Sequence, residues 1–365
     1  MGAELTLGAE EELHLVDTGT LTLASRAAEL LTQLPGESFC AELQRSTIET
    51  NTAPVRTLDE LRRELLALRR RLVDVAEPLG LGVAAVGTVP RSTAKDFELT
   101  GEDRYRRLQE LYRELVDEQL ICGTQVHVGI ADRDLAVEVA QRLEPDLPTF
   151  VALSAGSPFW QGHDTGYASF RTIVWQRWPT AGPMGQLSSA AEYDRLVADL
   201  VASGVIADAK MAYFEVRPSS HVPTLELRVC DAVPLVDDAV LIAGLFRAAA
   251  RAAELDIEAG RPARLVPPPL HRAAMWQAAR GGLSASLFVE QRHPRPVPAA
   301  DAARELLARL RPALEEFGDY AFVADALERL LARGTSADRQ RTAVRQGGLD
   351  AAMRSVIEET QSGLD

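Results

Sequence analysis

Apolar and polar residues alternate at the beginning of the chain. Between residues 5 and 15, the apolar side chains fall mainly on odd positions, whereas Glu10, Glu12 and His14 fall on even ones. Because the side chains of a strand point alternately to its two faces, this pattern predicts a half-buried strand with Glu10 and Glu12 side by side on its polar face. Glu11 has the parity of the apolar residues, and we expect it to point away from those two carboxylates.

Three later segments repeat this alternation: residues 124–130, 211–217 and 224–229. His127 lies on the polar side of the first of these segments, and Glu226 lies on the polar side of the last. A short, turn-rich stretch separates the last two segments, which indicates an antiparallel connection. An antiparallel sheet with helices against its apolar face and an open polar face accommodates every segment.

Helical signals surround the strands. Thr57 and Glu60 have the spacing of a capping box, and the leucines that follow form one apolar stripe that ends at Gly80. We interpret the arginines of this helix as a solvent-exposed face. They are Arg62, Arg63, Arg69, Arg70 and Arg71.

Further helices are predicted at three places. One covers roughly residues 103–118, and a second begins near Ser189, where Glu192 again has the capping-box spacing. After Val236 the chain is almost wholly helical in pattern. The second half of the chain therefore adds mainly helices to the sheet.

The length of 365 residues exceeds the size at which one core usually stops growing, so one large domain or two smaller ones is expected. Proline-rich breaks occur at residues 267–269 and 294–298. We take the second break as the boundary between a main unit, residues 1–290, and a helical C-terminal region, residues 299–365, packed on the same unit.

Composition and charge exclude several classes of protein. The net charge of -14 argues against a nucleic-acid partner, because binding to phosphate backbones depends on clustered cations. No apolar run approaches the roughly 20 residues that span a bilayer, and the first residues carry acid where a signal peptide carries base. Cys40, Cys122 and Cys230 are odd in number and widely spaced, which favours free thiols in a cytoplasmic protein.

The polar strand faces carry a set of residues suited to metal binding. The set comprises Glu10, Glu12, Glu49, His127, Glu226 and Arg228, with Glu42 close in sequence. Carboxylates lined along one face repel one another unless cations compensate, and such oxygen ligands select Mg²⁺, Mn²⁺ or Ca²⁺. Glu42 and Glu49 differ in parity, so both reach the site only if a bulge or loop separates them. Strands with a solvated face also carry Glu and Arg merely for solubility and cross-strand pairing, and this alternative stays open here.

Motifs that define other common sites are absent. The chain has no G-x-x-x-x-G-K-[ST] phosphate loop, no G-x-G-x-x-G after a strand and no G-x-S-x-G turn. Any ATP is therefore bound without a phosphate loop.

Several stretches resemble one known group of enzymes. Gly8–Glu12 is similar to the G-x-E-x-E opening of the glutamate–cysteine ligases, and Cys122–Gly129 is similar to their histidine strand. Residues 152–183 and 213–238 resemble the bacterial carboxylate–amine ligases, also called type 2 glutamate–cysteine ligases. The resemblance covers the chain as far as about residue 238.

This resemblance implies an α+β fold like the catalytic domain of glutamine synthetase, in which a curved antiparallel sheet forms an open funnel backed by helices. It also implies that ATP and Mg²⁺, with Mn²⁺ as a possible substitute, bind on the carboxylate-bearing face of the sheet. Glutamate would be activated through its γ-carboxylate as an acyl phosphate, for attack by cysteine or another small amine. The expected partners are small-molecule substrates and a second copy of the chain in a homodimer.

The resemblance also implies a role for each matching residue. Glu10, Glu12, Glu42, Glu49, His127 and Glu226 become metal ligands. Arg228 would stabilise the phosphoryl group or the tetrahedral intermediate, and Arg171 would bind the carboxylate of the amino-acid substrate. We expect the substrate side of the funnel to be lined by Trp160, Tyr167, Arg171, Trp175, Arg177 and Trp178. The role of His163 stays open.

Two other functions are compatible with these motifs. One is a ligase of unrelated substrates in a specialised biosynthetic pathway. The other is a catalytically silent subunit that binds ATP and Mg²⁺ on behalf of a partner.

Overall fold

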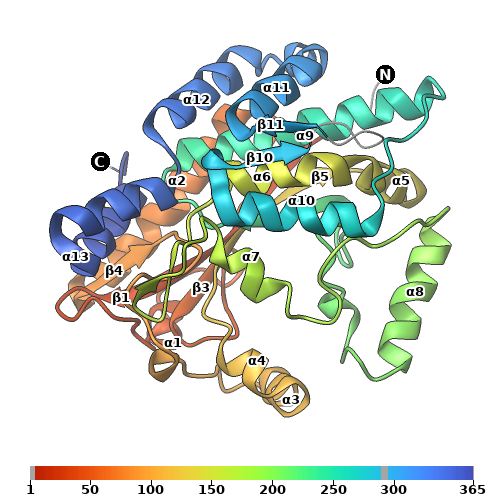
Figure 1. Ribbon diagram of the computed structural model, residues 1–365. Coiled ribbons are helices and arrows are strands. Elements are labelled where there is room, and N and C mark those ends of the chain that lie inside the picture. Colours follow the sequence, from red (N-terminus) through yellow and green to blue (C-terminus); the bar gives the residue numbers. More distant parts are fainter. Residues whose placement is uncertain (1–4, 289–294, 365) are drawn as a thin grey trace.

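A computed structural model describes residues 5–288 and 295–364, and its centre is a seven-stranded antiparallel sheet (Figure 1). The strand order is β2-β3-β1-β5-β9-β8, and β4 also pairs with β1. The strands of this sheet are β1 (Leu7–Asp17), β2 (Phe39–Ala41), β3 (Thr47–Asn51), β4 (Leu81–Ala84), β5 (Gly123–Gly129), β8 (Val216–Pro218) and β9 (Thr224–Asp231). Two small hairpins consist of β6 (Phe159–Trp160) with β7 (His163–Asp164) and of β10 (Ser286–Phe288) with β11 (Pro296–Pro298).

The helices precede, connect and follow these strands. The α-helices are α1 (Ala27–Leu31), α2 (Leu58–Ala76), α3 (Asp103–Tyr112), α4 (Glu114–Asp117), α5 (Arg133–Leu143), α6 (Leu147–Ser154), α7 (Phe170–Trp175), α8 (Ala190–Ala202), α9 (Val236–Glu258), α10 (Pro268–Gly281), α11 (Ala299–Glu316), α12 (Tyr320–Arg333) and α13 (Ser336–Thr360). The predicted α+β class with an antiparallel sheet and a helical C-terminal part is confirmed.

The local signals located most of these elements. Thr57 and Glu60 form the predicted capping box at the start of α2, and the side chain of Ser189 caps α8. The helix predicted over residues 103–118 is divided instead into α3 and α4, because Arg113 between them adopts a positive φ of 55°. The strand predicted over residues 211–217 is also shorter, since β8 begins only at Val216.

The apolar face of the sheet is covered by helices. Leu7 on β1, Val126 on β5 and Leu227 on β9 belong to one buried core with the apolar side chains of α5, α6 and α9. The helix α2 adds Leu61 and Leu65 to the same core. No helix in the described part of the chain is long and apolar enough to cross a membrane.

The C-terminal helices pack on this layer rather than on the polar face of the sheet. Figure 1 shows α11 and α12 outside α9, while α13 lies beside β4. Leu310 of α11 and Leu327 of α12 are buried in the same core as the helices that cover the sheet. The division at residue 290 stays a prediction, and Pro294, the first residue of the proline-rich break, lies outside the described residues.

One arginine of α2 is placed differently from the sequence interpretation. Arg69 is fully buried and forms an ion pair with Glu11, which is also fully buried; the closest Nη2–Oε1 distance is 2.6 Å. The same guanidinium donates to the carbonyls of Val233, Pro234 and Thr360. The interpretation of the whole arginine run as a solvated face is therefore wrong for Arg69. Glu11 does point away from Glu10 and Glu12, as its parity predicted, and it requires a buried cation there.

We predict that Arg69→Met destabilises the protein much more than Arg71→Met. Removing the guanidinium leaves Glu11 buried without a cation, and breaking such a buried pair costs about 3–5 kcal/mol. Arg71 is exposed on the same helix, so its replacement should change the free energy of unfolding by no more than about 0.5 kcal/mol. Urea denaturation of the two variants measures the difference, and equal losses would show that the Glu11–Arg69 pair does not support the fold.

Candidate active site

A cavity of about 850 Å³ lies on the polar face of the sheet. Its lining comes from β1, β2, β3, β5, β8 and β9, from the loops around them and from α3 and α7. Within the described residues, none of the lining side chains comes from beyond Arg228, so the C-terminal helices do not contribute to its wall. A cavity of this volume is in the range of small-molecule sites.

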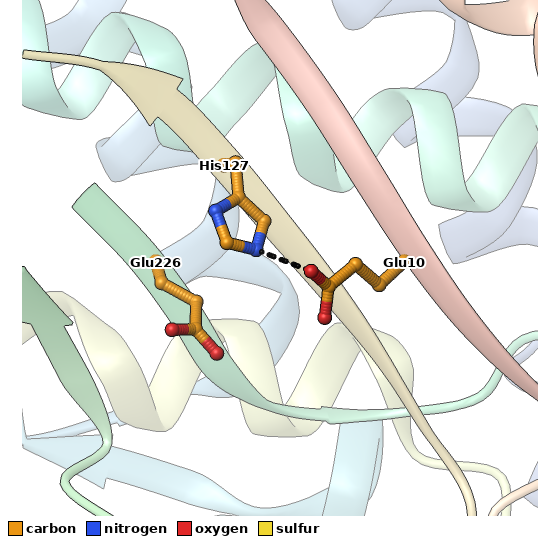
Figure 2. A group of neighbouring side chains, drawn as sticks. All are labelled: Glu10, His127 and Glu226. Atoms are coloured by element: carbon orange, nitrogen blue, oxygen red, sulfur yellow. Dashed lines mark ion pairs between the residues drawn. The ribbon is translucent and has the colours of Figure 1, made fainter. Parts of the chain in front are cut away.

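Glu10, His127 and Glu226 form one group of potential metal ligands at this cavity. Figure 2 shows the three side chains pointing toward one another from β1, β5 and β9, and each offers a ligand atom within 4.8 Å of the others. The Nε2 atom of His127 lies 3.1 Å from Oε1 of Glu10, while its Nδ1 atom is 2.8 Å from the hydroxyl of Thr224. With the proton on Nδ1, the lone pair of Nε2 would bind a metal ion held between Glu10 and Glu226.

Glu12, Glu42 and Glu49 form a second group with the same spacing. Glu12 is on β1 and Glu49 is its direct partner on β3. Glu42 follows the end of β2 and lies in the loop before β3. The difference in parity between Glu42 and Glu49 is thus resolved by a loop, one of the two solutions that the sequence allowed.

The two groups differ in their electrostatic surroundings. Burial, opposed by Arg171 and reinforced by Glu49, raises the pKa of Glu12 to about 7. Burial together with the neighbouring carboxylates also raises the pKa of Glu42 well above its usual value. The second group therefore concentrates negative charge that a divalent cation would neutralise.

In the first group, arginine side chains compensate the negative charge of Glu226. Burial would raise the pKa of Glu226, but Arg228 and Arg217 outweigh it and hold that pKa well below the usual range. Arg217 reaches Oε2 of Glu226 at 3.0 Å, and Arg228 contacts the other oxygen. Glu226 is consequently kept ionised, which is the state that a metal ligand needs.

Two arginines pack close to one aromatic ring in the wall of the cavity. The guanidinium carbons of Arg171 and Arg228 are each 5.6 Å from the ring centre of Trp175. Both guanidinium groups are buried, and their Nε atoms have no hydrogen-bond partner within the described residues. Both arginines line the cavity, where their positive charges favour the binding of an anion.

The predicted lining residues of the substrate side are divided by the structure. Arg171, Trp175 and Trp178 line the cavity. Trp160, Tyr167 and Arg177 are absent from its described lining, and their part in substrate binding stays a prediction. His163 is exposed in the β6–β7 hairpin.

The helix α7 explains this division. Arg171 and Trp175 are four residues apart, so both occupy the helix face that meets the cavity. Phe170 is on another face, where it packs against Trp160 and Tyr167 with ring centres 5.7 and 5.9 Å away. Arg177 lies beyond the end of α7 and pairs with Glu118.

Three further residues complete the site. Gln125 accepts a hydrogen bond from Arg228, Thr224 orients His127, and Arg217 fixes Glu226. All three have the parity of the polar face in their own segments, and that alternation was the signal available in the sequence. Their partners depend on strand register, which the alternation does not specify.

Solved structures share this fold. A crystal structure of a glutamate–cysteine ligase from Francisella tularensis in complex with AMP superposes with a TM-score of 0.71 and 14 % identity, over 99 % of this chain and 90 % of that one. A bifunctional glutathione synthetase from Pasteurella multocida gives a TM-score of 0.70 at 15 % identity, over 99 % of this chain and 52 % of that one. The architecture is thus that of the glutamate–cysteine ligases.

The sequence relationship defines the family. The model of glutamate–cysteine ligase family 2 matches residues 6–359, and the chain belongs to this family. A protein of Mycolicibacterium smegmatis named "Putative glutamate–cysteine ligase 2-2" is 53 % identical over 341 residues, 93 % of this chain and 86 % of that protein. A protein of Frankia casuarinae with the same name is 52 % identical over 361 residues, 98 % of this chain but 42 % of that protein. The chain thus spans less than half the length of this second relative.

We expect both groups of ligands to bind Mn²⁺, used as a probe for Mg²⁺. Glu226→Gln should weaken one class of site and Glu49→Gln another, each by at least about tenfold, the scale on which even outer partners of metal ligands act. Glu102→Gln is the matched control, because Glu102 lines the same cavity but belongs to neither group. Titration followed by the electron paramagnetic resonance of free Mn²⁺ measures each variant. Unchanged binding in both Glu226→Gln and Glu49→Gln would contradict the assignment.

Proposed function

We propose that this protein is an ATP-dependent carboxylate–amine ligase that activates the γ-carboxylate of glutamate for attack by cysteine or another small amine. The observation that carries the proposal is the meeting of two groups of potential metal ligands and two buried arginines on one cavity. Membership of glutamate–cysteine ligase family 2 supports the same reaction class. The AMP bound to the Francisella tularensis enzyme supports an adenine nucleotide as co-substrate.

Different side chains would bind the amino-acid substrate and the metal ions. Arg171 would bind a carboxylate of the amino-acid substrate through its guanidinium, which lines the cavity and packs against the ring of Trp175. Glu10, His127 and Glu226 would hold one Mg²⁺, and Glu12, Glu42 and Glu49 another. When bound, such ions neutralise the charge of the nucleotide phosphates.

The proposed reaction has two steps. A carboxylate oxygen of the first substrate attacks the γ-phosphorus of ATP, and the bond to ADP breaks, which yields an acyl phosphate. The amine then attacks the acyl carbon, inorganic phosphate leaves and the amine nitrogen loses a proton. Arg228 lies beside Glu226 and Gln125, where its fixed positive charge would stabilise the negative charge that develops on the transferring oxygens.

We also propose that the protein works in the cytoplasm. Its three cysteines, Cys40, Cys122 and Cys230, are all free thiols, which suits a reducing compartment. The homodimer remains a prediction from the resemblance.

The test is a grid of carboxylates and amines incubated with the purified chain, ATP and Mg²⁺, with ADP release and product mass measured in each combination. We expect an amide from L-glutamate and L-cysteine, or from L-glutamate and another small amine, with one ADP formed for each amide. Glu226→Gln should lower kcat by about 100-fold or more, the scale of a lost electrostatic stabiliser, whereas Glu102→Gln should retain turnover.

Other results would redirect or contradict the proposal. An amide formed only from other carboxylates would identify a ligase of a specialised pathway and rule out glutamate. Nucleotide binding without ADP release in any combination would contradict turnover and favour a silent nucleotide-binding subunit.

A further inference from the structure

Asp231 is a buried carboxylate that the proposed reaction does not use. It is the last residue of β9, the strand that also carries Glu226 and Arg228. Its side chain has no exposed surface. A charge in such a place must be compensated by hydrogen bonds or cations, and the partners of Asp231 show what it holds in place.

A β-bulge brings Asp231 to the polar face of the sheet. In the pairing of β5 with β9, Val126 lies opposite Leu227, but Thr124 lies opposite Cys230. Between these two pairs β9 advances by three residues while β5 advances by two. Beyond the extra residue, the side chains of β9 therefore point to the opposite faces from those that strict alternation would give them. Asp231 consequently lies opposite Gly123, on the same face as the pair His127 and Glu226.

The carboxylate of Asp231 accepts three hydrogen bonds from two loop segments. Its Oδ2 atom accepts from the backbone N–H of Gly156 at 2.8 Å and from the hydroxyl of Ser157 at 2.7 Å. Its Oδ1 atom accepts from the hydroxyl of Ser169 at 2.7 Å. All of these partners donate, so the site fits an ionised carboxylate better than an amide.

The two serines in turn hold the helix that carries Arg171. The hydroxyl oxygen of Ser157 accepts the backbone N–H of Arg171 at 2.9 Å. The hydroxyl oxygen of Ser169 accepts the N–H of Thr172 at 3.3 Å and caps α7. Because both serine hydroxyls donate their hydrogen to Asp231, the oxygen of each hydroxyl is free to accept a hydrogen bond from a backbone N–H in the first turn of α7.

The guanidinium of Arg171 lies over the residue that pairs with Asp231. A Cβ atom on Gly123 would be only 2.3 Å from Nη2 of Arg171, so the glycine leaves the space that this guanidinium occupies. The same Nη2 atom donates to the backbone carbonyl of Arg228 at 3.4 Å. Arg171 is therefore connected to β9 at its backbone through Asp231 and at its tip through Arg228.

We propose that Asp231 is a positioning residue that sets the location of Arg171 relative to Arg228, and thereby governs recognition of the substrate carboxylate. The inference rests on the proposed function, in which Arg171 binds that carboxylate. Asp231 touches no reacting atom. Its influence passes through the hydroxyls of Ser157 and Ser169 and the first turn of α7, and its charge also attracts the guanidinium of Arg171 directly.

The test is a double-mutant cycle on the full chain with L-glutamate as probe. Asp231→Asn should raise the KM for L-glutamate by roughly 10- to 100-fold, because small misplacements of a substrate-binding group have effects of this size. The KM for ATP should not change. In an Arg171→Ala background, Asp231→Asn should have no further effect on the KM for L-glutamate, since its route of action is already removed.

Two controls separate positioning from stability. Asp238→Asn replaces another buried carboxylate, which pairs with Arg333 on α12, and should lower the melting temperature without changing the KM for L-glutamate. If Asp231→Asn does not fold, Ser157→Ala and Ser169→Ala each remove one of the two relays and should raise the same KM. A crystal structure of any of these three variants should show the Arg171 guanidinium displaced from Trp175.

Three outcomes would overturn the inference. An equal effect of Asp231→Asn with and without Arg171 would mean that it acts by another route. A variant crystal structure in which Arg171 has not moved would also show that Asp231 does not position Arg171, and this result does not depend on the identity of the substrate. An unchanged KM for L-glutamate in Arg171→Ala would remove the role assigned to Arg171, while ADP formation in the substrate grid would still test the ligase reaction separately.

Discussion

The register of β1 against its neighbours is the constraint on which both faces of the sheet depend. A slip of one residue would turn Glu10 and Glu12 into the core and bring Glu11 to the cavity. The Glu11–Arg69 pair opposes such a slip, because the slip would break this buried pair and would bury both Glu10 and Glu12, and a carboxylate buried without a cation is very costly. Arg69 also binds carbonyls after β9 and at the end of α13, so the pair that fixes this register also connects the sheet to the C-terminal helix.

The arginines of the polar face are distributed unevenly among its carboxylates. Glu226 has two guanidinium partners and stays ionised, whereas burial raises the pKa of both Glu12 and Glu42. The group around Glu12 therefore has the greater need of a bound cation, and the group around Glu226 is closer to a preformed site. This asymmetry follows from strand position, because Arg217 and Arg228 are on β8 and β9, whereas the carboxylates of the second group lie on β1, on β3 and in the loop between β2 and β3.

The sequence predicted which face the metal-ligand candidates of the strands occupy, but not which residues are their neighbours. Alternation placed the metal-ligand candidates of the strands on one face, while their division into two groups depends on strand pairing, which alternation does not encode. Arg69 was misinterpreted because a run of arginines on a helix usually faces solvent, and its buried partner lies 58 residues away. The segment around Trp160, Tyr167 and Arg177 has no periodicity, so that only the fold shows which side of α7 meets the cavity.

The face of the sheet that Asp231 occupies could not be predicted from the alternation of the sequence. Strict alternation along β9 assigns it to the apolar face with Leu225 and Leu227, yet the bulge after Leu227 turns it to the face of Glu226. The same bulge directs both Val229 and Cys230 into the core, so the chain loses no apolar contact by the reversal. One strand can thus present Glu226 and Arg228 to the cavity and still end with a carboxylate that holds the neighbouring helix. The positions of Arg228 and Arg171 are linked because both depend on β9.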